Sequence, residues 1–372
     1  MKVCVDIQAA IAQRAGVGRY ARMLVEHLAP LAGKDELALF YFDFKRSGVP
    51  FPVPGAEQQA VQWCPGRIVQ KAWKTMGWPP FDWFAGRADI YHFPNFILPP
   101  LTRGRTAVTI HDVAFLRHPE AAEKRNLKYL NSRIADTVKR ADAILTDSHF
   151  SAREITELLK VPPEKLYPVH LGLSPDMKPA SQEAIEKVRN LYGLQKPFLL
   201  TVGTLEPRKN IPFLIDVFER LADFDGDLVI AGMKGWSYEP IIARMQESRH
   251  AERIRYLEYV EDGLLSALYS GAELFVFPTI YEGFGFPPLE AMACGTPVVS
   301  SNAGPLPELL GSAAALVDGY LAGEWVEMLS GVLRDELRRN ALRAKGLEQS
   351  AKFDWNKTAA ETWKIYRKII RG

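Results

Sequence analysis

Two glutamates, Glu282 and Glu290, stand eight residues apart in the stretch YEGFGFPPLEAMACG at 281–295. Eight residues correspond to about two turns of α-helix, so the pair could lie on one helical face. Gly283 and Gly285 separate the two glutamates, however, and glycine lets a backbone approach a ligand closely. The spacing alone therefore leaves two interpretations open: a surface feature of a helix, or two acceptors around one ligand.

The prolines favour the second interpretation. Pro288 fits the first position of a helix, and Gly295 fits the stop after LEAMAC. Glu290 would then lie in the first turn, where the helix dipole favours a carboxylate, while Pro287 at the N-cap offers no side chain for a capping box. Glu282 would lie outside the helix. We therefore expect two carboxylates at opposite ends of a glycine loop, suited to hydroxyl groups on two sugars of one ligand.

A second cluster, LLTVGTLEPRKN at 199–210, joins a buried strand to a helix. The strand is expected to end near Gly203, and Asn210 is a favourable N-cap residue for the helix that follows. Arg208 and Lys209 thus fall between a strand end and a helix start. Two cations and the N–H groups of a helix start suit a diphosphate. The alternative is a pair of solvated cations with no ligand.

The elements that position these residues alternate along the chain. Short apolar runs, rich in Val, Ile, Leu and Phe, are separated by amphipathic stretches, which is typical of parallel sheets covered on both faces. The pattern predicts an α/β protein with two doubly wound domains, in which ligands bind just beyond the carboxyl ends of strands. Strands are expected at 2–7, 37–43, 89–95, 106–112, 143–148, 198–204, 227–233, 254–260, 274–279 and 296–301, with helices such as 18–32 and 126–141 between them.

The boundary between the domains is expected in YPVHLGLSPDMKPA at 167–180, where prolines and glycine interrupt the alternation. We expect a first domain at 1–170 and a second at 171–354. The amphipathic C-terminal helix, 355–372, is expected to pack back on the first domain. A chain of 372 residues is long enough for two domains of ordinary size.

The composition predicts a cytoplasmic globular protein. The three cysteines have no paired or metal-like spacing, which indicates free thiols in a reducing compartment. No apolar run approaches the ~20 residues of a membrane-spanning helix. Residues 1–167 carry 23 Lys and Arg against 17 Asp and Glu. This basic half could serve an anionic lipid surface or a phosphorylated partner, or it could be ordinary uneven surface charge.

The stretch at 63–84, WCPGRIVQKAWKTMGWPPFDWF, interrupts the alternation of strands and helices. Its aromatic and basic side chains suit a membrane interface or a cover over a lipid-linked acceptor; a segment at the edge of the core fits equally well. Single-stranded nucleic acid is a poor partner because the total charge is near neutral. The residues concerned are Trp73, Trp78, Trp83, Arg67, Lys71 and Lys74.

Several motifs in their order along the chain are similar to those of one enzyme family. GTLEPRKN and the paired glutamates, together with GVGRY at 16–20, TIHD at 109–112 and LTDSHFSAREI at 145–155, resemble the large retaining glycosyltransferase family known as group 1, or GT4. The resemblance covers most of the chain. It implies the GT-B fold, in which two Rossmann-like parallel-sheet domains face a cleft, the first on the acceptor side and the second binding a nucleotide-sugar.

The resemblance also implies roles for residues of the second domain. Arg208 and Lys209 would hold the donor diphosphate and stabilise it as it leaves. Glu290 would accept hydrogen bonds from the ribose, and Glu282 from the transferred sugar. A further group of donor-binding residues is implied: Gly203 and Thr204 in the first loop, the backbone of Phe284 and Gly285, and Tyr259 and Val260 near the base. Many members of the family have Arg at the position of Thr204.

In the first domain the resemblance places His111 against the donor sugar, where it would act with Arg208, Lys209 and Glu282 in catalysis. Gly16 and Gly18 would form a glycine loop near the phosphate and the acceptor. GVGRYA also matches a dinucleotide fingerprint, but the first strand ends near Ile7, too early for the tight turn that this motif needs.

We expect no metal and no other cofactor, because no Asp-x-Asp stands at a strand end. The donor would be a GDP-sugar or a UDP-sugar, with GDP-mannose as the first hypothesis. The acceptor would be a saccharide or a lipid-linked saccharide in surface-polysaccharide assembly. We expect no nucleic acid partner. Peripheral contact with the inner face of the membrane stays open.

Three alternatives remain on the same fold. One is a transferase that uses a UDP-sugar. Another is a nucleotide-sugar epimerase, which would turn over its substrate without an acceptor. The third is a non-catalytic partner subunit, which would have no need of Arg208, Lys209, Glu282, Glu290 and His111 together.

Overall fold

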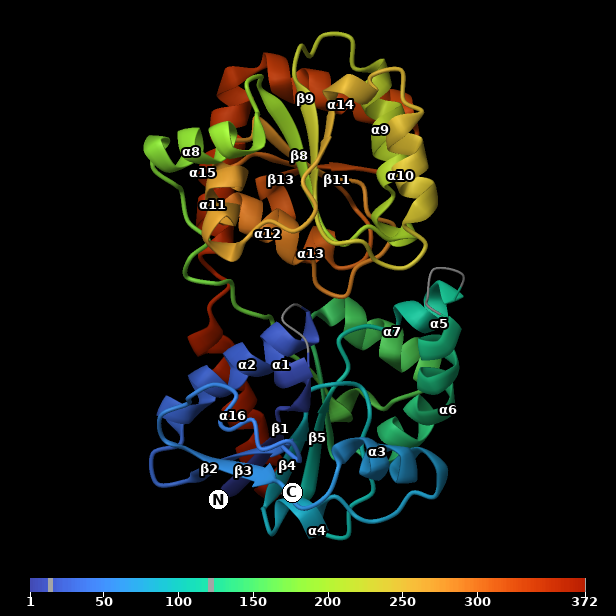
Figure 1. The fold of residues 1–372 in the computed structure, drawn as a ribbon, viewed down its shortest axis with the longest axis vertical. Helices are drawn as coiled ribbons and strands as arrows, with labels where there is room; N and C mark the ends of the chain where they lie inside the picture. The colour runs from blue at the N-terminus through green and yellow to red at the C-terminus, as the bar shows by residue number, and fades with distance from the viewer. Residues whose placement is uncertain (13–15, 120–123, 372) are drawn as a thin grey trace. The chain divides into compact units, whose positions relative to one another are not determined.

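The computed structural model describes residues 1–12, 16–119 and 124–371, which form two compact α/β units (Figure 1). The first unit comprises Met1–Arg117, Lys124–Gly172 and the C-terminal residues from Asp354 on, and the second comprises Leu173–Phe353 together with residues 118–119. The chain thus passes from one unit to the other after Gly172 and returns after Phe353.

The first unit is built on a seven-stranded sheet in which every pair of neighbours is parallel. The order is β3-β2-β1-β4-β5-β6-β7, so the chain runs outward from β1 to one edge and then returns to pair β4 with β1. This reversal between β1 and β4 is a topological switch point. The strands are β1 Lys2–Asp6, β2 Glu36–Phe42, β3 Ala56–Val61, β4 Ile90–Phe93, β5 Arg105–Thr109, β6 Ala143–Thr146 and β7 Leu166–Pro168.

Helices cover both faces of this sheet, with α2 and α16 on one side and α6 and α7 on the other (Figure 1). The α-helices are α1 Gln8–Ala12, α2 Val17–Leu28, α3 Gly66–Thr75, α4 Asp82–Ala85, α5 Ala114–Arg117, α6 Lys124–Arg140, α7 His149–Leu159 and α16 Trp355–Arg371; short 3₁₀ turns are η1 Ala29–Leu31 and η3 Pro163–Lys165. In the part of the chain that the structure describes, no helix is both long and apolar enough to cross a membrane.

The C-terminal helix α16 is part of the first unit. Its Tyr366 hydroxyl lies 2.6 Å from Nδ1 of His92, whose Nε2 lies 2.9 Å from Oγ1 of Thr109. His92 is completely buried, and burial lowers its pKa to about 3, so this histidine is neutral and structural. Gly172 lies so close to Trp355 that a Cβ would come within 2.2 Å of the Trp355 backbone nitrogen.

The second unit has a six-stranded parallel sheet in the order β10-β9-β8-β11-β12-β13. Its topology resembles that of the first sheet: the chain runs from β8 outward to β10 and then returns to pair β11 with β8. The switch point here lies between β8 and β11. The strands are β8 Phe198–Val202, β9 Asp227–Ala231, β10 Ile254–Tyr256, β11 Leu274–Phe277, β12 Val298–Ser301 and β13 Ala314–Val317.

This sheet too is covered on both faces, by α9, α10 and α14 on one side and by α8, α11, α12 and α15 on the other (Figure 1). Trp325 of α14 is completely buried in the core between α9 and the sheet, and its indole N–H donates to the carbonyl of Gly319 at 3.0 Å. The helices are α8 Gln182–Tyr192, η4 Pro207–Lys209, α9 Ile211–Arg220, α10 Glu239–Gln246, η5 Ala251–Arg253, α11 Asp262–Ser270, α12 Phe286–Ala293, α13 Leu306–Leu310, η6 Gly311–Ala313, α14 Ala322–Arg334 and α15 Glu336–Ser350.

The expected fold class, α/β with two doubly wound parallel sheets, is confirmed. Strands β3, β7 and β13 were not expected from the sequence. All three lie at sheet edges. β7 has only three residues, and β13, AALV, is apolar but short. β3 has no continuous apolar run, because an edge strand can be buried less. The sequence of β3, AEQQAV, illustrates this, since only its last residue is fully buried.

Candidate functional site

Three charged side chains meet at the switch point of the second sheet. Lys209 and Arg208 follow β8, and Glu282 follows β11, so the loops after adjacent strands bring them together. Lys209 Nζ lies 2.6 Å from Glu282 Oε1, and Arg208 Nη1 lies 2.8 Å from Glu282 Oε2. Lys209 and Glu282 are only 7% and 5% exposed. One carboxylate therefore holds two cations at the carboxyl ends of the central strands, where ligands bind in open parallel sheets.

Backbone contacts fix the two loops against each other. The carbonyl of Arg208 accepts from the backbone N–H of Ile280 at 2.8 Å and from the hydroxyl of Thr279 at 3.0 Å. The 3₁₀ turn η4 carries both cations, and Asn210, with φ 56°, ends that turn before α9 begins. Asn210 occupies the expected N-cap position, but its side chain makes no capping hydrogen bond in this left-handed conformation. The cations thus sit on a rigid turn, which favours preorganisation.

The Lys209 side chain is buried and closely packed. Its ammonium lies 5.0 Å from the centre of the Phe277 ring, a distance typical of a cation–π contact. A Cβ on Gly203, whose φ is 157°, would lie 3.3 Å from Cε of Lys209. Thr279 has a single hydroxyl proton, which it shares between the Arg208 carbonyl and Oε1 of Glu282, the latter 2.7 Å from Thr279 Oγ1. Oε1 of Glu282 also accepts from Lys209.

Burial and charge act in opposite directions on Glu282. Burial alone would raise the pKa of its carboxyl group, but the charges of Arg208 and Lys209 outweigh this effect and hold the pKa at about 2. Burial, together with the neighbouring Arg208, lowers the pKa of Lys209 against the attraction of Glu282. Arg208 is further paired with Glu206, with Nε 2.6 Å from Oε1. Glu282 is consequently ionised at neutral pH.

Glu290 lies deeper in its helix than the sequence suggested. Helix α12 begins at Phe286 rather than Pro288, so Glu290 is its fifth residue and lies beyond the first turn. The reason is Gly285, which takes the N-cap position with φ 107° and thereby lets both prolines occupy the first turn, where no N–H is needed. Glu290 is buried, and its Oε2 accepts from the hydroxyl of Tyr269 at 3.0 Å.

His111 belongs to the first unit and follows β5. Its Nδ1 lies 2.8 Å from Oδ2 of Asp147, and its Nε2 lies 3.3 Å from the carbonyl oxygen of Pro94. Burial opposes a charge on the ring, but the Asp147 carboxylate outweighs it and raises the pKa of His111. Since both ring nitrogens face oxygen acceptors, the imidazolium form fits this pocket. The edge of the Tyr20 ring packs against the imidazole, with ring centres 4.8 Å apart.

The remaining predicted residues occupy less central positions. Gly16, with φ 58°, is the N-cap of α2, and Gly18 lies in its first turn. In the second unit Phe284 is buried and packs its ring on Phe286, 5.0 Å away between centres. Exposed Tyr259 and buried Val260 follow β10, at the edge of the sheet, and Thr204 is exposed in the loop after β8. Their roles toward a ligand stay predictions.

Two residues that were not predicted from the sequence contact predicted functional residues, one in each unit. Thr279 joins the Arg208 carbonyl to the Glu282 carboxylate, and Asp147 orients His111. Each stands directly after a strand, at the end of LFVFPT and within LTDSHFSAREI. The position of these residues after a strand could therefore have pointed to them. The sequence does not show which residue each of them contacts.

Two parallel sheets with paired cations at one switch point define a two-domain α/β enzyme, and comparisons with known proteins name the family. The model described as "Glycosyl transferases group 1" matches residues 182–349, and "Glycosyltransferase Family 4" matches residues 14–177. The O-antigen chain mannosyltransferase B of Escherichia coli is 32% identical over 370 residues, which cover 95% of this chain and 96% of that protein. The chain belongs to the group 1 glycosyltransferases, within family 4.

Solved structures agree at the level of the fold. A sucrose-phosphate synthase from Thermosynechococcus elongatus has a TM-score of 0.78 at 18% identity and covers 100% of this chain and 99% of its own. Alr3699/HepE of Anabaena, solved in complex with UDP-glucose, has a TM-score of 0.72 at 16% identity, covering 98% and 100%. The protein is thus a glycosyltransferase with the GT-B fold.

Proposed function

We propose that this glycosyltransferase is a retaining, metal-independent mannosyltransferase that moves mannose from GDP-mannose to a saccharide during surface-polysaccharide assembly. The observation that carries the proposal is the pair of cations that Glu282 holds at the second switch point. A nucleotide diphosphate leaves with negative charge on its oxygens, and preorganised cations stabilise that charge as it develops. The choice of mannose rests on the similarity to a mannosyltransferase over nearly the whole chain.

In the proposed reaction the bond between the sugar C1 and the phosphate oxygen breaks while Arg208 and Lys209 stabilise the departing diphosphate. An acceptor hydroxyl oxygen forms the new bond to C1 on the face that the phosphate leaves. The hydroxyl proton passes to the departing phosphate oxygen, so atoms and charge balance. Configuration at C1 is retained without a protein nucleophile. Glu282 keeps both cations in place and accepts hydrogen bonds from the sugar.

Two further side chains complete the proposed site. Glu290, at the buried end of the glycine loop, accepts hydrogen bonds from the ribose hydroxyls. His111 of the first unit, which Asp147 keeps as an imidazolium, is the remaining residue that the proposal assigns to catalysis. With two fixed cations on the diphosphate, no divalent metal is needed to neutralise it.

A peripheral membrane contact through α3 and α4 is part of the proposal. Three indoles and two aliphatic side chains are more than half exposed there, and basic residues lie among them. Trp78 and Trp83 contact each other with ring centres 5.6 Å apart, which keeps two rings together at the surface. Indole rings and basic residues are favoured at the headgroup level of anionic membranes. The apolar residues are Trp63, Ile68, Met76, Trp78 and Trp83, and the basic ones are Arg67, Lys71 and Lys74.

Calorimetric titration with GDP, UDP, GDP-mannose and UDP-N-acetylglucosamine, each in EDTA, tests the donor assignment. We expect GDP and GDP-mannose to bind and the uridine compounds to bind much more weakly. Tight binding of the uridine series instead would replace GDP-mannose with a UDP-sugar donor. Binding that appears only with added Mg²⁺ would refute metal independence. Turnover of a nucleotide-sugar to its epimer without acceptor would support the epimerase alternative.

A further inference from the structure

Four buried polar side chains of the first unit form a continuous series of hydrogen bonds. The hydroxyl of Tyr366 in α16 lies 2.6 Å from Nδ1 of His92 in β4, and Nε2 of His92 lies 2.9 Å from Oγ1 of Thr109, the last residue of β5. The same oxygen lies 2.9 Å from the hydroxyl of Tyr20 in α2. We call these four residues the Tyr366–Tyr20 network. It joins the C-terminal helix, through two neighbouring strands, to the helix that contains the GVGRY motif.

The Tyr366–Tyr20 network is rigid because its members are buried and paired with one another. None of the four residues is more than 4% exposed. His92 is neutral, so one ring nitrogen donates and the other accepts, and the hydroxyls of Tyr366 and Thr109 must take opposite roles. A buried polar group that loses its partner is costly, so each hydrogen bond constrains the next one. The position of Tyr20 therefore depends on Tyr366, although the two lie on different helices.

The ring of Tyr20 lies directly against His111. The two ring centres are 4.8 Å apart and the ring planes are nearly perpendicular, at 86°, a geometry that aromatic rings prefer. The ring of Phe96 makes a second contact with the imidazole, with 5.7 Å between ring centres. These contacts add to the hydrogen bonds of the imidazole with Asp147 and Pro94. Two aromatic rings thus restrict the rotation of the imidazole and shield it from water.

The backbone of Phe96 is strained. Its φ is 49°, in the left-handed region that a residue with a bulky side chain rarely adopts. The N–H of Phe96 donates to the carbonyl of Thr109 at 2.9 Å, which holds this conformation. Strained backbone persists where its surroundings determine it, and it gathers at functional sites. Thr109 therefore fixes both rings that contact His111, Tyr20 through its hydroxyl and Phe96 through its carbonyl.

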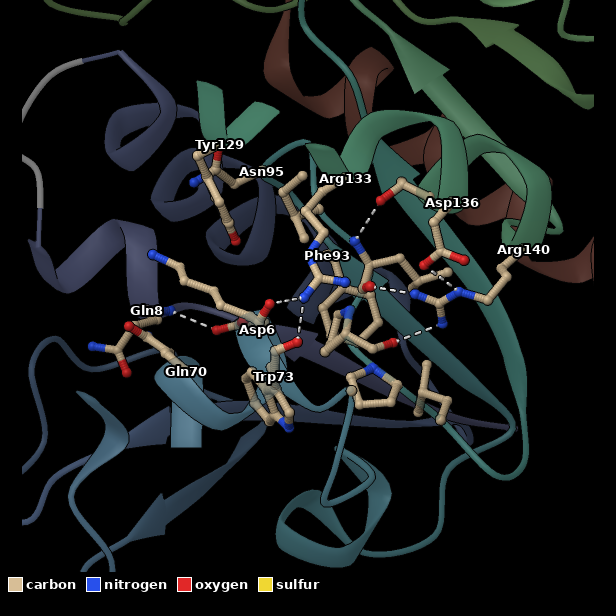
Figure 2. A pocket seen from close by; sticks show the side chains of 18 of the residues that line it. Asp6, Gln8, Gln70, Trp73, Phe93, Asn95, Tyr129, Arg133, Asp136 and Arg140 are labelled. Carbon is tan, nitrogen blue, oxygen red and sulfur yellow. Dashed lines mark hydrogen bonds and ion pairs between the residues drawn. The ribbon is translucent and has the colours of Figure 1, made fainter. Parts of the chain in front are cut away.

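The loop after β4, which contains Phe96, also forms one wall of a cavity of about 580 Å³ in the first unit. Figure 2 shows Phe93 and Asn95 among the side chains that line this cavity. Pro94 belongs to the same wall, and its carbonyl oxygen lies 3.3 Å from Nε2 of His111. His111 itself does not line the cavity. The position of the imidazole and the shape of this wall are therefore coupled.

We propose that Tyr20 is a positioning residue for His111, and that the Tyr366–Tyr20 network makes the C-terminal helix part of this function. Tyr20 keeps the imidazole oriented toward Asp147 and shields it from water. Tyr366 acts only through His92 and Thr109. The proposal rests on the proposed function for the catalytic role of His111, whereas the effect of Tyr20 on the imidazole follows from the contacts alone.

NMR titration of the His111 imidazole in the full chain tests the effect of Tyr20. Burial is the largest influence on the pKa of His111 and lowers it, while Asp147 raises it. Tyr20→Ala admits water, so we expect the pKa of His111 to rise above its wild-type value. Tyr20→Phe keeps the ring and loses only the hydroxyl, so the rise should be smaller. Asp112 and His92, whose charges also act on or respond to His111, are unchanged in both variants.

Tyr366→Phe tests the network, because it removes one hydroxyl from a different helix and leaves Tyr20 intact. We expect it to shift the imidazole resonances of His111 and to raise its pKa less than Tyr20→Ala does. Tyr41→Phe is the matched control, since Tyr41 is a buried tyrosine of β2 outside the network, and it should leave His111 as in the wild type.

Equal His111 titrations in Tyr366→Phe and Tyr41→Phe would overturn the part assigned to the C-terminal helix. An unchanged pKa in Tyr20→Ala would overturn the positioning role of Tyr20. If Tyr20→Ala does not fold, Tyr20→Phe takes its place, and a His111 titration equal to that of the wild type would then overturn the proposal.

Kinetic measurements separate this proposal from the proposed function. With GDP-mannose as donor, Tyr20→Ala should lower kcat about tenfold with little change in KM, because a misplaced catalytic group slows the chemical step. A shifted His111 titration together with wild-type kcat would refute the catalytic role of His111 and support its positioning by Tyr20. A wild-type chain that neither binds GDP nor transfers mannose would refute the proposed function, and the NMR titrations would still decide the role of Tyr20.

Discussion

Lys209 and Glu282 form a buried ion pair, 2.6 Å between Nζ and Oε1, across loops that follow two neighbouring strands. The two residues are 73 positions apart in the chain. A pair this deeply buried loses the hydration of both charges, so its net contribution to folding is small while the loss of one partner is costly. The arrangement therefore makes sense as a means of holding cations for a ligand rather than as a device for stability.

Glu282→Gln should destabilise the fold by about 3–5 kcal/mol, because it leaves the Lys209 ammonium buried without its carboxylate. Lys209→Met should destabilise the fold by a similar amount, because it leaves the buried Glu282 carboxylate without the Lys209 ammonium. The double variant should cost clearly less than the sum of the two, and urea unfolding of all four proteins measures the difference. Additive effects would mean that the two side chains are not coupled.

The free energy of unfolding of the wild-type protein should fall as the pH is lowered from about 4.5 toward 2. The folded pKa of Glu282, about 2, lies below its ordinary value of 4.5. A depressed carboxyl pKa contributes stability that is present above pH 4.5 and is lost as the pH falls toward 2, by about 3 kcal/mol in total. Glu282→Gln should show a shallower decline of unfolding free energy between pH 5 and 2. Parallel pH curves for both proteins would contradict the pKa assignment.

Arg208→Ala should lower kcat by about 10²–10³-fold, since one of two donors aimed at the departing diphosphate is lost. Arg208→Lys keeps the charge but not the geometry that pairs Nη1 with Glu282 and Nε with Glu206, so it should recover only part of the activity. Arg220→Ala, an exposed arginine at the end of α9, is the control. Wild-type kcat in Arg208→Ala would remove Arg208 from the mechanism.

Asp147→Asn should lower the pKa of His111 below its ordinary 6.5, because burial then acts without the opposing carboxylate. The imidazolium would be lost at a lower pH, and the alkaline limb of the kcat profile should shift to lower pH with it. NMR titration of the imidazole protons gives the pKa directly. Asp112→Asn, which removes a weaker neighbouring charge, should produce a smaller shift, and an equal shift would argue against a special role of Asp147.

Trp78→Ser combined with Met76→Ser should weaken binding to vesicles that contain anionic lipid, because it removes two of the exposed apolar side chains of the proposed membrane face. Co-sedimentation with vesicles of mixed phosphatidylglycerol and phosphatidylethanolamine measures this. Leu337→Ser, at a still more exposed apolar residue of the second unit, is the control. Equal sedimentation of the wild type and the double variant would refute the contact.

The parts of the fold that the sequence predicted are those with a local signal. Central strands such as β9 and β11 are continuous apolar runs because they are buried on both faces. The edge strand β3 has no such run and was missed. The start of α12 was misplaced because a glycine in a left-handed conformation acts as its N-cap, a conformation that a proline-based rule does not anticipate.

The candidate site, too, could be predicted from the sequence only in part. Arg208, Lys209 and Glu282 could be chosen from the sequence because they stand in loops that follow buried strands, and ligands of open parallel sheets bind at the carboxyl ends of strands. Their mutual contacts depend on β11 pairing with β8, which is a tertiary fact. In the first unit, Arg133 of α6 likewise donates to the backbone carbonyl of Trp73 in α3, and neither helix reveals that partner in its own sequence.

The passage of the chain between the units has a consequence for protein engineering. The backbone N–H of Leu173 donates to the carbonyl of Phe353 at 3.1 Å, so the second unit begins and ends at one place. Topologically it is an insertion within the first unit, which needs α16 to complete its core. Truncation at 353 would therefore damage the first unit as well. A chimera that exchanges Leu173–Phe353 as one cassette would leave both cores whole and transplant the loops that carry Arg208, Lys209 and Glu282.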